Sequence, residues 1–335
     1  MRVTRSALKK IVQNTVSQRT RSDRGIISIY LCGSLLEESY LLGGTTDIDL
    51  VFIHGESLER AREIVRLTDE IHLDIAHHLE KDYRNTRNLR VHPWMGPTVY
   101  FCEIQYDPQH FMDFTQASVR GQYDRSDHVL ERVRKQADQA RQFWFSYHLD
   151  VPQAGAQEIE EYLNAVENAV NAVASLSGRP LTTRRFLMKF PEKADAVGWP
   201  GLYPGVLGLL GAPQVDAETL RAWLAPWKTA YQALDVEQAP VRLHPARQAY
   251  YLQAFEALIN GPEPEHVLWP LLRTWTLAIN HLPEKSPARR DWAQALDRLG
   301  LMGEGFEERL DALDAFLDMV EETIEKWARE NGALV

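Results

Sequence analysis

Residues 31–52 read LCGSLLEESYLLGGTTDIDLVF, and this stretch decides the fold that we expect. A Gly-Ser pair ends one apolar run, and Asp47 and Asp49 lie inside the next. Because residues i and i+2 of a β-strand point to the same face, the two aspartates place their carboxylates side by side in an otherwise apolar strand. Adjacent carboxylates repel each other unless a cation compensates, and Mg²⁺ is the default cation for such hard oxygen ligands.

The sequence around this stretch predicts a short mixed β-sheet with flanking helices. Strands are expected at 26–32, 48–53, 71–76 and 98–104, and helices at 4–20 and 56–70. Asp74 repeats the pattern as a single carboxylate between apolar neighbours, although it could instead pair with a nearby arginine. If the second and third strands pair side by side, Asp74 joins Asp47 and Asp49. Three carboxylates on adjacent strands suit two metal ions about 4 Å apart.

The Gly33-Ser34 pair supplies a candidate phosphate-binding turn. Glycine lets the backbone approach a ligand closely, and backbone N–H groups together with a serine hydroxyl can hold a triphosphate. His77 and His78 follow the third strand among charged residues, so we expect both to be exposed and leave them out of the site. Each feature alone is common, but their order and spacing together are specific.

This order and spacing resemble the nucleotidyltransferases of the DNA polymerase beta superfamily. The motif of that family is Gly-Ser, then roughly a dozen residues, then Asp-hydrophobic-Asp-hydrophobic. Here Gly33-Ser34 is followed after twelve residues by residues 47–50, which read Asp-Ile-Asp-Leu. Thr46 stands where a small hydroxyl residue often precedes the first aspartate of the family motif. The resemblance covers about residues 25–110.

The resemblance implies a role for each residue of the motif. The catalytic residues, which also hold a two-metal Mg²⁺ site, would be Asp47, Asp49 and Asp74. The residues that bind the nucleotide triphosphate would be Gly33, Ser34 and Thr46. By their chemistry, Arg184 and Arg185 could also reach phosphate as bidentate donors, and we add Arg185 to the nucleotide-binding set, but both could equally open a helix and pair with acidic neighbours.

From about residue 127 the sequence predicts helices almost without interruption. One apolar stripe, with steps of four and three residues, consists of Ile159, Leu163, Val166, Val170 and Val173. A longer one consists of Phe306, Leu310, Leu313, Leu317, Val320, Ile324 and Trp327. Such stripes need partner helices, so we expect an α+β protein with a catalytic domain at 1–125 and an all-α bundle at 126–335 that shapes the acceptor site. The expected bundle core includes Trp223, Trp227, Trp269, Trp275 and Trp292.

Charge is distributed unevenly along the 335 residues, whose formal net charge is -10. Residues 1–150 carry 20 Lys and Arg against 21 Asp and Glu, whereas residues 151–335 carry 17 against 26. This balance disfavours nucleic acid as the main ligand. If the acidic C-terminal half receives the acceptor, it would attract a polycationic small molecule such as an aminoglycoside. The alternative is that much of this charge is simply the solvent-exposed face of the last helix.

Two further features bear on the environment of the protein. Cys32 and Cys102 lie in apolar runs without disulfide or metal-ligand spacing, so we expect buried reduced thiols. The polar N-terminal sequence and the lack of an apolar run of about 20 residues predict a cytoplasmic protein without a membrane partner.

A helical bundle after such a domain resembles the small-molecule branch of the superfamily, the kanamycin nucleotidyltransferase type. This implies transfer of a nucleoside monophosphate, AMP from ATP or its equivalent from another NTP, to a hydroxyl of a small molecule, with release of pyrophosphate. Enzymes of this type often build their site across a homodimer. The sequence singles out no general base among the candidates Glu103, Glu158, Glu161 and Glu167. The alternatives are an enzyme that transfers AMP to a protein and a noncatalytic nucleotide-binding or interaction module.

Overall fold

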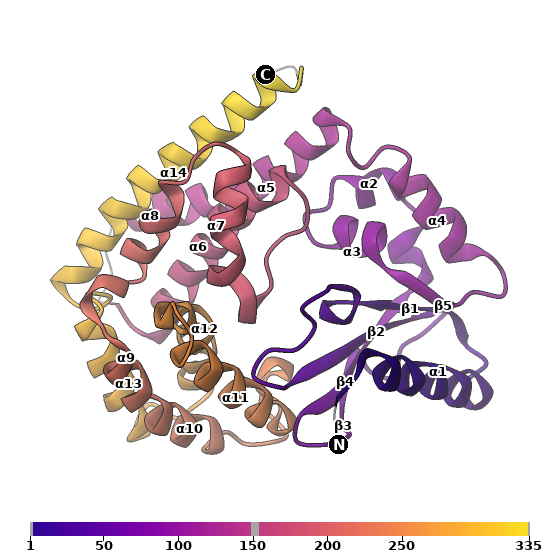
Figure 1. Ribbon diagram of the computed structural model, residues 1–335, viewed down its shortest axis with the longest axis horizontal. Coiled ribbons are helices and arrows are strands. Elements are labelled where there is room, and N and C mark those ends of the chain that lie inside the picture. The colour runs from indigo at the N-terminus through magenta and orange to yellow at the C-terminus, as the bar shows by residue number, and fades with distance from the viewer. Residues whose placement is uncertain (1–2, 149–153, 334–335) are drawn as a thin grey trace. The chain divides into compact units, whose positions relative to one another are not determined.

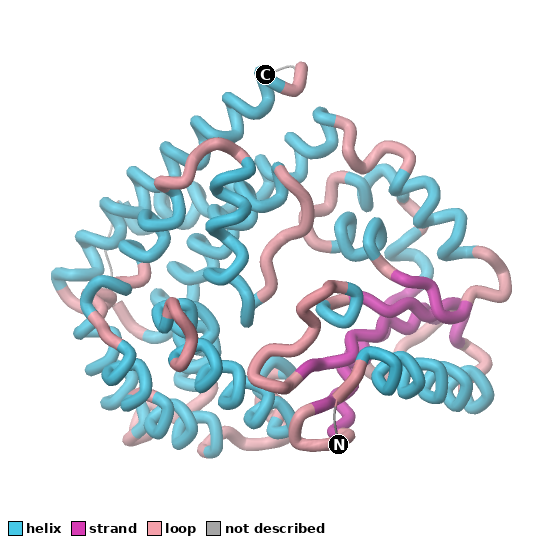
Figure 2. The backbone as a smooth tube through the Cα atoms, viewed as in Figure 1, coloured by secondary structure: helices cyan, strands magenta, loops and turns pink. Residues whose placement is uncertain are grey.

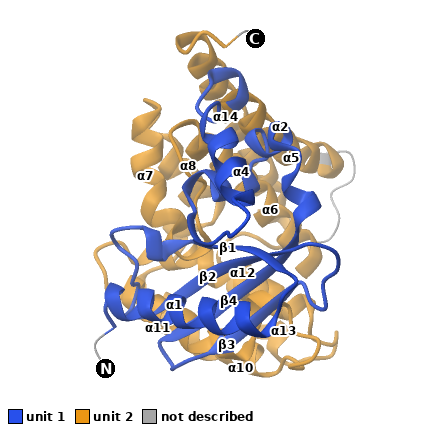
Figure 3. Cartoon of the chain, turned by 90° about the vertical axis from the view of Figure 1, so that its right-hand side faces the viewer, with its two compact units in different colours: residues 1–128 blue, residues 129–335 orange. Residues whose placement is uncertain are grey.

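The computed structural model describes residues 3–148 and 154–333 (Figure 1). The chain divides into two compact units, residues 1–128 and 129–335 (Figure 3). The first unit contains all strands that the structure describes, and every element described in the second unit is helical (Figure 2). The expected α+β class with a helical C-terminal region is therefore confirmed.

A five-stranded mixed sheet forms the centre of the first unit. In chain order the strands are β1 (Ile26–Cys32), β2 (Thr46–His54), β3 (Arg62–Arg66), β4 (Ile71–Leu79) and β5 (Glu103–Tyr106). Their spatial order is β3-β4-β2-β1-β5, so β2 and β1 occupy the interior with β4. The β2–β4 pair is parallel, and the other pairs are antiparallel.

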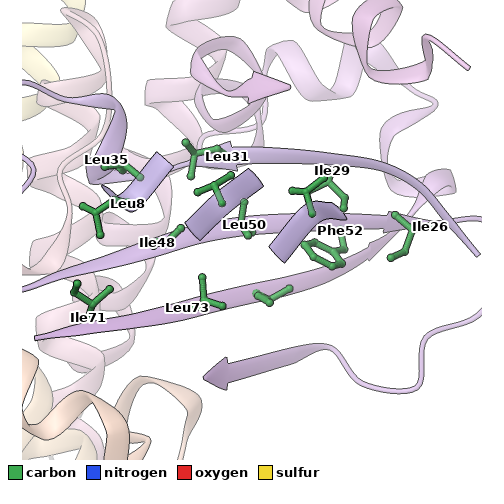
Figure 4. Packing of buried hydrophobic residues seen from close by; sticks show 13 residues of the cluster. Leu8, Ile26, Ile29, Leu31, Leu35, Ile48, Leu50, Phe52, Ile71 and Leu73 are labelled. Carbon is green, nitrogen blue, oxygen red and sulfur yellow. The ribbon is translucent and has the colours of Figure 1, made fainter. Parts of the chain in front are cut away.

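Helices cover both faces of this sheet. Their bounds are α1 (Arg5–Ser22), α2 (Thr86–Arg90), α3 (Met95–Phe101) and α4 (Phe111–Arg120). The side chain of Thr4 accepts a hydrogen bond from the backbone N–H of Ala7 and so caps α1. Leu8 of α1 belongs to an apolar cluster with side chains of β1, β2 and β4, several of which are labelled in Figure 4.

The two faces of β2 bury different sets of side chains. Ile48, Leu50 and Phe52 belong to the cluster that contains Leu8. Val51 and Ile53 belong to a second cluster, with residues of α2, α3 and α4. Because side chains alternate along a strand, Asp47 and Asp49 lie on the same face as this second cluster.

Two predicted elements of the first unit are wrong. The expected helix at 56–70 is instead an edge strand, β3, between loops. Its sequence contains good helix formers, but pairing with the open edge of β4 satisfies its backbone groups, and Ile64 and Val65 suit a strand. The expected strand at 98–104 is helix α3 followed by β5. The side-chain amide of Gln116 donates to the carbonyls of Val99 and Cys102 where these two elements meet.

The second unit consists of packed helices. They are α5 (Ser126–His148), α6 (Ala156–Leu176), α7 (Phe186–Ala196), α8 (Leu202–Leu209), α9 (Ala217–Ala222), α10 (Leu224–Gln232), α11 (Gln248–Ile259), α12 (Leu268–Asn280), α13 (Ala288–Arg298) and α14 (Glu304–Glu330). The predicted stripe of α6 is completely buried, and that of α14 is buried except for the partly exposed Trp327. Four of the five expected core tryptophans are buried, whereas Trp223 is partly exposed. No helix among the described residues has the length and apolarity needed to cross a membrane.

Candidate metal and nucleotide site

The register of two parallel strands brings three carboxylates together. Asp49 of β2 lies opposite Asp74 of β4, and Asp47 precedes Asp49 on the same face. One carboxylate oxygen from each aspartate can be chosen so that all three lie within 4.8 Å of one another. The register is fixed because Leu50 and Ile75, which also lie opposite each other, both face the core. A slip of one residue would move them out of it. The expected side-by-side pairing of these strands is confirmed.

Burial makes this cluster of carboxylates electrostatically costly. Asp74 is 2% exposed and Asp47 is 8% exposed. Arg62 of β3 supplies one compensating charge: its Nε lies 2.5 Å from Oδ1 of Asp74, and its Nη2 lies 2.7 Å from Oδ2. Asp74 thus takes part in both arrangements considered from the sequence, because it lies among the aspartates and also pairs with an arginine.

Gly33 lies directly against the cluster. It follows Cys32, which pairs with Asp49 across β1 and β2. Its φ is +75°, and a Cβ placed on it would lie 1.8 Å from Oδ2 of Asp49. Only glycine fits this conformation and this contact. The turn that the sequence predicts as a phosphate-binding element is therefore adjacent to a carboxylate of the cluster.

Two hydroxyl groups connect this turn to the start of β2. The Oγ of Ser34, in the short 3₁₀ helix η1 (Ser34–Leu36), lies 3.4 Å from the Oγ1 of Thr46. The hydroxyl of Thr46 also donates to the carbonyl of Asp47 at 3.1 Å, and Thr46 is completely buried. These contacts give Thr46 a structural role. Nucleotide binding by Gly33, Ser34 and Thr46 stays a prediction.

Arg185 lies in the second unit and not in the unit that holds the aspartates. It ends the short 3₁₀ helix η3 (Thr183–Arg185), immediately before α7, and is 6% exposed. Its neighbour Arg184 lies over the ring of Tyr250 and donates to the Tyr250 carbonyl at 3.1 Å. The expectation that the two arginines open a helix is confirmed, and phosphate binding by Arg185 stays a prediction.

Each of the four candidate general bases has a structural partner. Glu103 on the edge strand β5 pairs with Lys9 of α1. In the second unit, Glu158 accepts the backbone N–H of Gly155 at the start of α6, Glu161 accepts the hydroxyl of Tyr147, and Glu167 pairs with Arg273. None of the four stands out as a base by its surroundings.

The expectation that His77 and His78 are exposed is wrong. His77 on β4 forms hydrogen bonds with His54 of β2 at 2.9 Å and with Glu63 of β3 at 3.3 Å, so a hydrogen-bond network connects these three strands. His78 bonds to the hydroxyl of Tyr83. These contacts arise because β4 runs three residues further than predicted and carries both histidines into the sheet. Neither belongs to the cluster of aspartates.

Both cysteines are free, as expected, but only one is buried. Cys102 is buried, and desolvation raises the pKa of its thiol to about 12. Cys32 is partly exposed. Such a strongly raised pKa makes the Cys102 thiol unreactive at neutral pH, so its role is packing.

Sequence reasoning missed Arg62, whose guanidinium contacts both carboxylate oxygens of Asp74. The available signal was the β-branched pair Ile64-Val65, which favours a strand beside β4 over a helix. No protein-family model matches the chain, and no curated protein matches it significantly.

Proposed function

We propose that this chain is a Mg²⁺-dependent nucleotidyltransferase with the fold of the DNA polymerase beta superfamily. It transfers a nucleoside monophosphate, AMP from ATP in the first instance, to a hydroxyl of a small molecule and releases pyrophosphate. The observation that carries the proposal is the position of Asp47, Asp49 and Asp74 on two parallel strands, with Gly33 against Asp49.

The donor set fits Mg²⁺ by its chemistry. All three side chains offer carboxylate oxygens, which are hard ligands, and Mg²⁺ sites use one or two carboxylates together with substrate phosphates. Asp47, Asp49 and Asp74 would hold the metal ions. When bound, these ions neutralise charge on the transferring phosphoryl group and favour ionisation of the attacking hydroxyl.

The side chains and backbone of the site orient the reactants. The turn lies against Asp49 at Gly33, and the backbone N–H groups and the hydroxyl of Gly33 and Ser34 would hold the phosphates. Asp74 would position the acceptor hydroxyl as well as ligate metal. Both of its oxygens accept hydrogen bonds from Arg62, so we assign it the positioning role.

The acidic C-terminal half of the sequence favours a cationic acceptor, of which an aminoglycoside is one example. Residues 151–335 carry 17 Lys and Arg against 26 Asp and Glu. Part of this charge has another use, because three carboxylates of α14 pair with Arg141 of α5. The acidic excess therefore supports the class of acceptor more weakly than the aspartates support the chemistry.

The test measures pyrophosphate release by the full chain with Mg²⁺, each of the four NTPs and a panel of hydroxyl-bearing cations. Asp49→Asn should lower kcat/KM by at least about a hundredfold, since even ligand-supporting residues cost 10- to 100-fold. The matched control is Asp69→Asn, because Asp69 is exposed and pairs only locally with Arg66. Full activity of Asp49→Asn at saturating Mg²⁺ would overturn the proposal.

The same preparation separates the two alternatives. Labelled ATP added to a cell lysate would label protein if the acceptor is a protein side chain. Calorimetry would show Mg²⁺-dependent nucleotide binding without turnover if the chain is a noncatalytic module.

A further inference from the structure

Arg62 and Asp74 are diagonal neighbours on two antiparallel strands. The register pairs Arg62 with Ala76 and Ile64 with Asp74, so the arginine reaches across the pair to a residue two positions away. Its Nε and Nη2 contact separate oxygens of the carboxylate, at 2.5 and 2.7 Å. This is the fork geometry in which a guanidinium holds both oxygens at once.

The two partners differ in their freedom to move. The side chain of Asp74 is 1% exposed, and its strand is fixed between β2 and β3. The side chain of Arg62 is 45% exposed and belongs to β3, the edge strand of the sheet. If the contact opens, the arginine moves into solvent and the aspartate stays in place.

A divalent cation and the guanidinium of Arg62 would both bind the carboxylate oxygens of Asp74. Both carboxylate oxygens of Asp74 already accept a hydrogen bond from Arg62. A cation that ligates Asp74 together with Asp47 and Asp49 would bind an oxygen that Arg62 also contacts, and it would repel the positive guanidinium.

We propose that Arg62 compensates the charge of the Asp74 carboxylate in the absence of metal and competes with divalent cations for it. Metal occupancy of the aspartate cluster then requires Arg62 to give up at least one of its two contacts. The arginine stabilises a cluster of three carboxylates that would otherwise repel one another, and it lowers their affinity for metal. This inference rests on the proposed function and adds a control of metal loading to it.

A competing role and a purely structural role of Arg62 predict opposite changes in metal affinity when Arg62 is replaced. If Arg62 only keeps Asp74 in place, its removal loosens the cluster and weakens metal binding. If Arg62 competes, its removal takes a positive guanidinium away from both oxygens of a carboxylate that the strands hold in place, and metal binding becomes tighter. The direction of the change in metal affinity therefore separates the two roles.

The experiment titrates the full chain with Mn²⁺, without nucleotide, and follows free Mn²⁺ by electron paramagnetic resonance. Arg62→Gln should bind Mn²⁺ about tenfold more tightly than the unaltered protein, within the range usual for coupled sites. Arg60→Gln is the matched control, because Arg60 lies two residues away on the chain, is 59% exposed and forms an ion pair with Glu63 at 3.8 Å. Its Mn²⁺ affinity should not change.

Unchanged or weaker Mn²⁺ binding by a folded Arg62→Gln would overturn the proposal. If that variant does not fold, Arg62→Lys takes its place, because one ammonium cannot hold both oxygens in a fork, and its affinity should still rise. Failure of the proposed function has a different signature. Mn²⁺ binding that tightens in Arg62→Gln, together with no nucleotide transfer, would retain the role of Arg62 and reject the reaction.

Discussion

Gly33 and Asp49 are packed so closely that no side chain fits between them: a Cβ on Gly33 would lie 1.8 Å from Oδ2 of Asp49. The contact arises because β1 ends opposite Asp49, and the chain turns immediately afterwards with a φ of +75° at Gly33. Under the proposed function, the same closeness would let the backbone of this turn approach a phosphate beside the aspartates.

Replacing Gly33 by alanine should disturb the aspartate cluster. The added Cβ must displace the Asp49 carboxylate, and it also strains a backbone conformation that L residues rarely adopt, at a cost of about 1–3 kcal/mol. We expect a lower melting temperature and loss of Mn²⁺ binding, both measurable on the purified full chain.

Gly44→Ala is the matched control for this substitution. Gly44 has a similar φ of +77°, but a Cβ there meets nothing within 4 Å. It should therefore lose stability through backbone strain alone and keep its Mn²⁺ affinity. Equal loss of Mn²⁺ binding in both variants would contradict the importance of the Gly33–Asp49 contact.

Mg²⁺ should stabilise the folded protein through the aspartate cluster. A ligand that binds only the folded state at a hundred times its Kd adds about 2.7 kcal/mol. We expect the melting temperature to rise on exchange of EDTA for Mg²⁺. Asp49→Asn should remove this rise and, because it relieves repulsion among three carboxylates that lie close together, should melt higher than the unaltered protein in EDTA. An undiminished Mg²⁺ effect in Asp49→Asn would exclude Asp49 as a ligand.

The sequence predicted the part of the site that depends on strand periodicity. Alternation alone places Asp47 and Asp49 on one face, and the apolar residues around Asp74 predict a strand that can lie beside them. The apolar stripes of α6 and α14 followed in the same way from a helical period. In each case local pattern and tertiary packing require the same arrangement.

The features that the sequence did not reveal depend on tertiary pairing. Residues 56–70 favour a helix by composition, but Arg62–Arg66 form a strand that pairs with the edge of β4. The sequence therefore did not reveal that Arg62 is a partner of Asp74. His77 was expected in solvent because the extra length of β4 is not visible in its polar sequence. Nothing in the pattern of residues 183–185 distinguishes a phosphate-binding Arg185 from one that opens a helix, and the structure shows only its position before α7.

Arg141 should contribute to the stability of the second unit. Its guanidinium contacts Asp314, Asp318 and Glu321 of α14, and its side chain is 16% exposed. The three carboxylates are 38–72% exposed, but one mostly buried guanidinium joins all of them, so Arg141→Met should cost about 1 kcal/mol of unfolding free energy. Arg329→Met is the control, since an exposed i,i+4 pair such as Arg329–Glu325 contributes about 0.5 kcal/mol or less. Chemical denaturation measures both, and equal losses would contradict a special role for Arg141.

Acidification should destabilise the first unit through His54. Burial, followed by the neighbouring His77, lowers the pKa of His54, and Asp23 opposes the shift only in part. The unfolded state therefore binds more protons than the folded state, so this contribution to stability is complete above the unfolded pKa of about 6.5 and is lost as the pH falls through the lower folded value.

The melting temperature of the full chain should accordingly fall between pH 7.5 and pH 5.5, and His54→Gln should fall less over this range than the unaltered protein. His78 has a pKa that burial lowers in the same way, so part of the dependence remains in that variant. His110→Gln provides a contrast, because its hydrogen bond to Asp113 raises the pKa of His110 and its removal cannot reduce the loss of stability in acid. A pH dependence that is identical in His54→Gln and the unaltered protein would contradict a lowered pKa of His54 in the folded state.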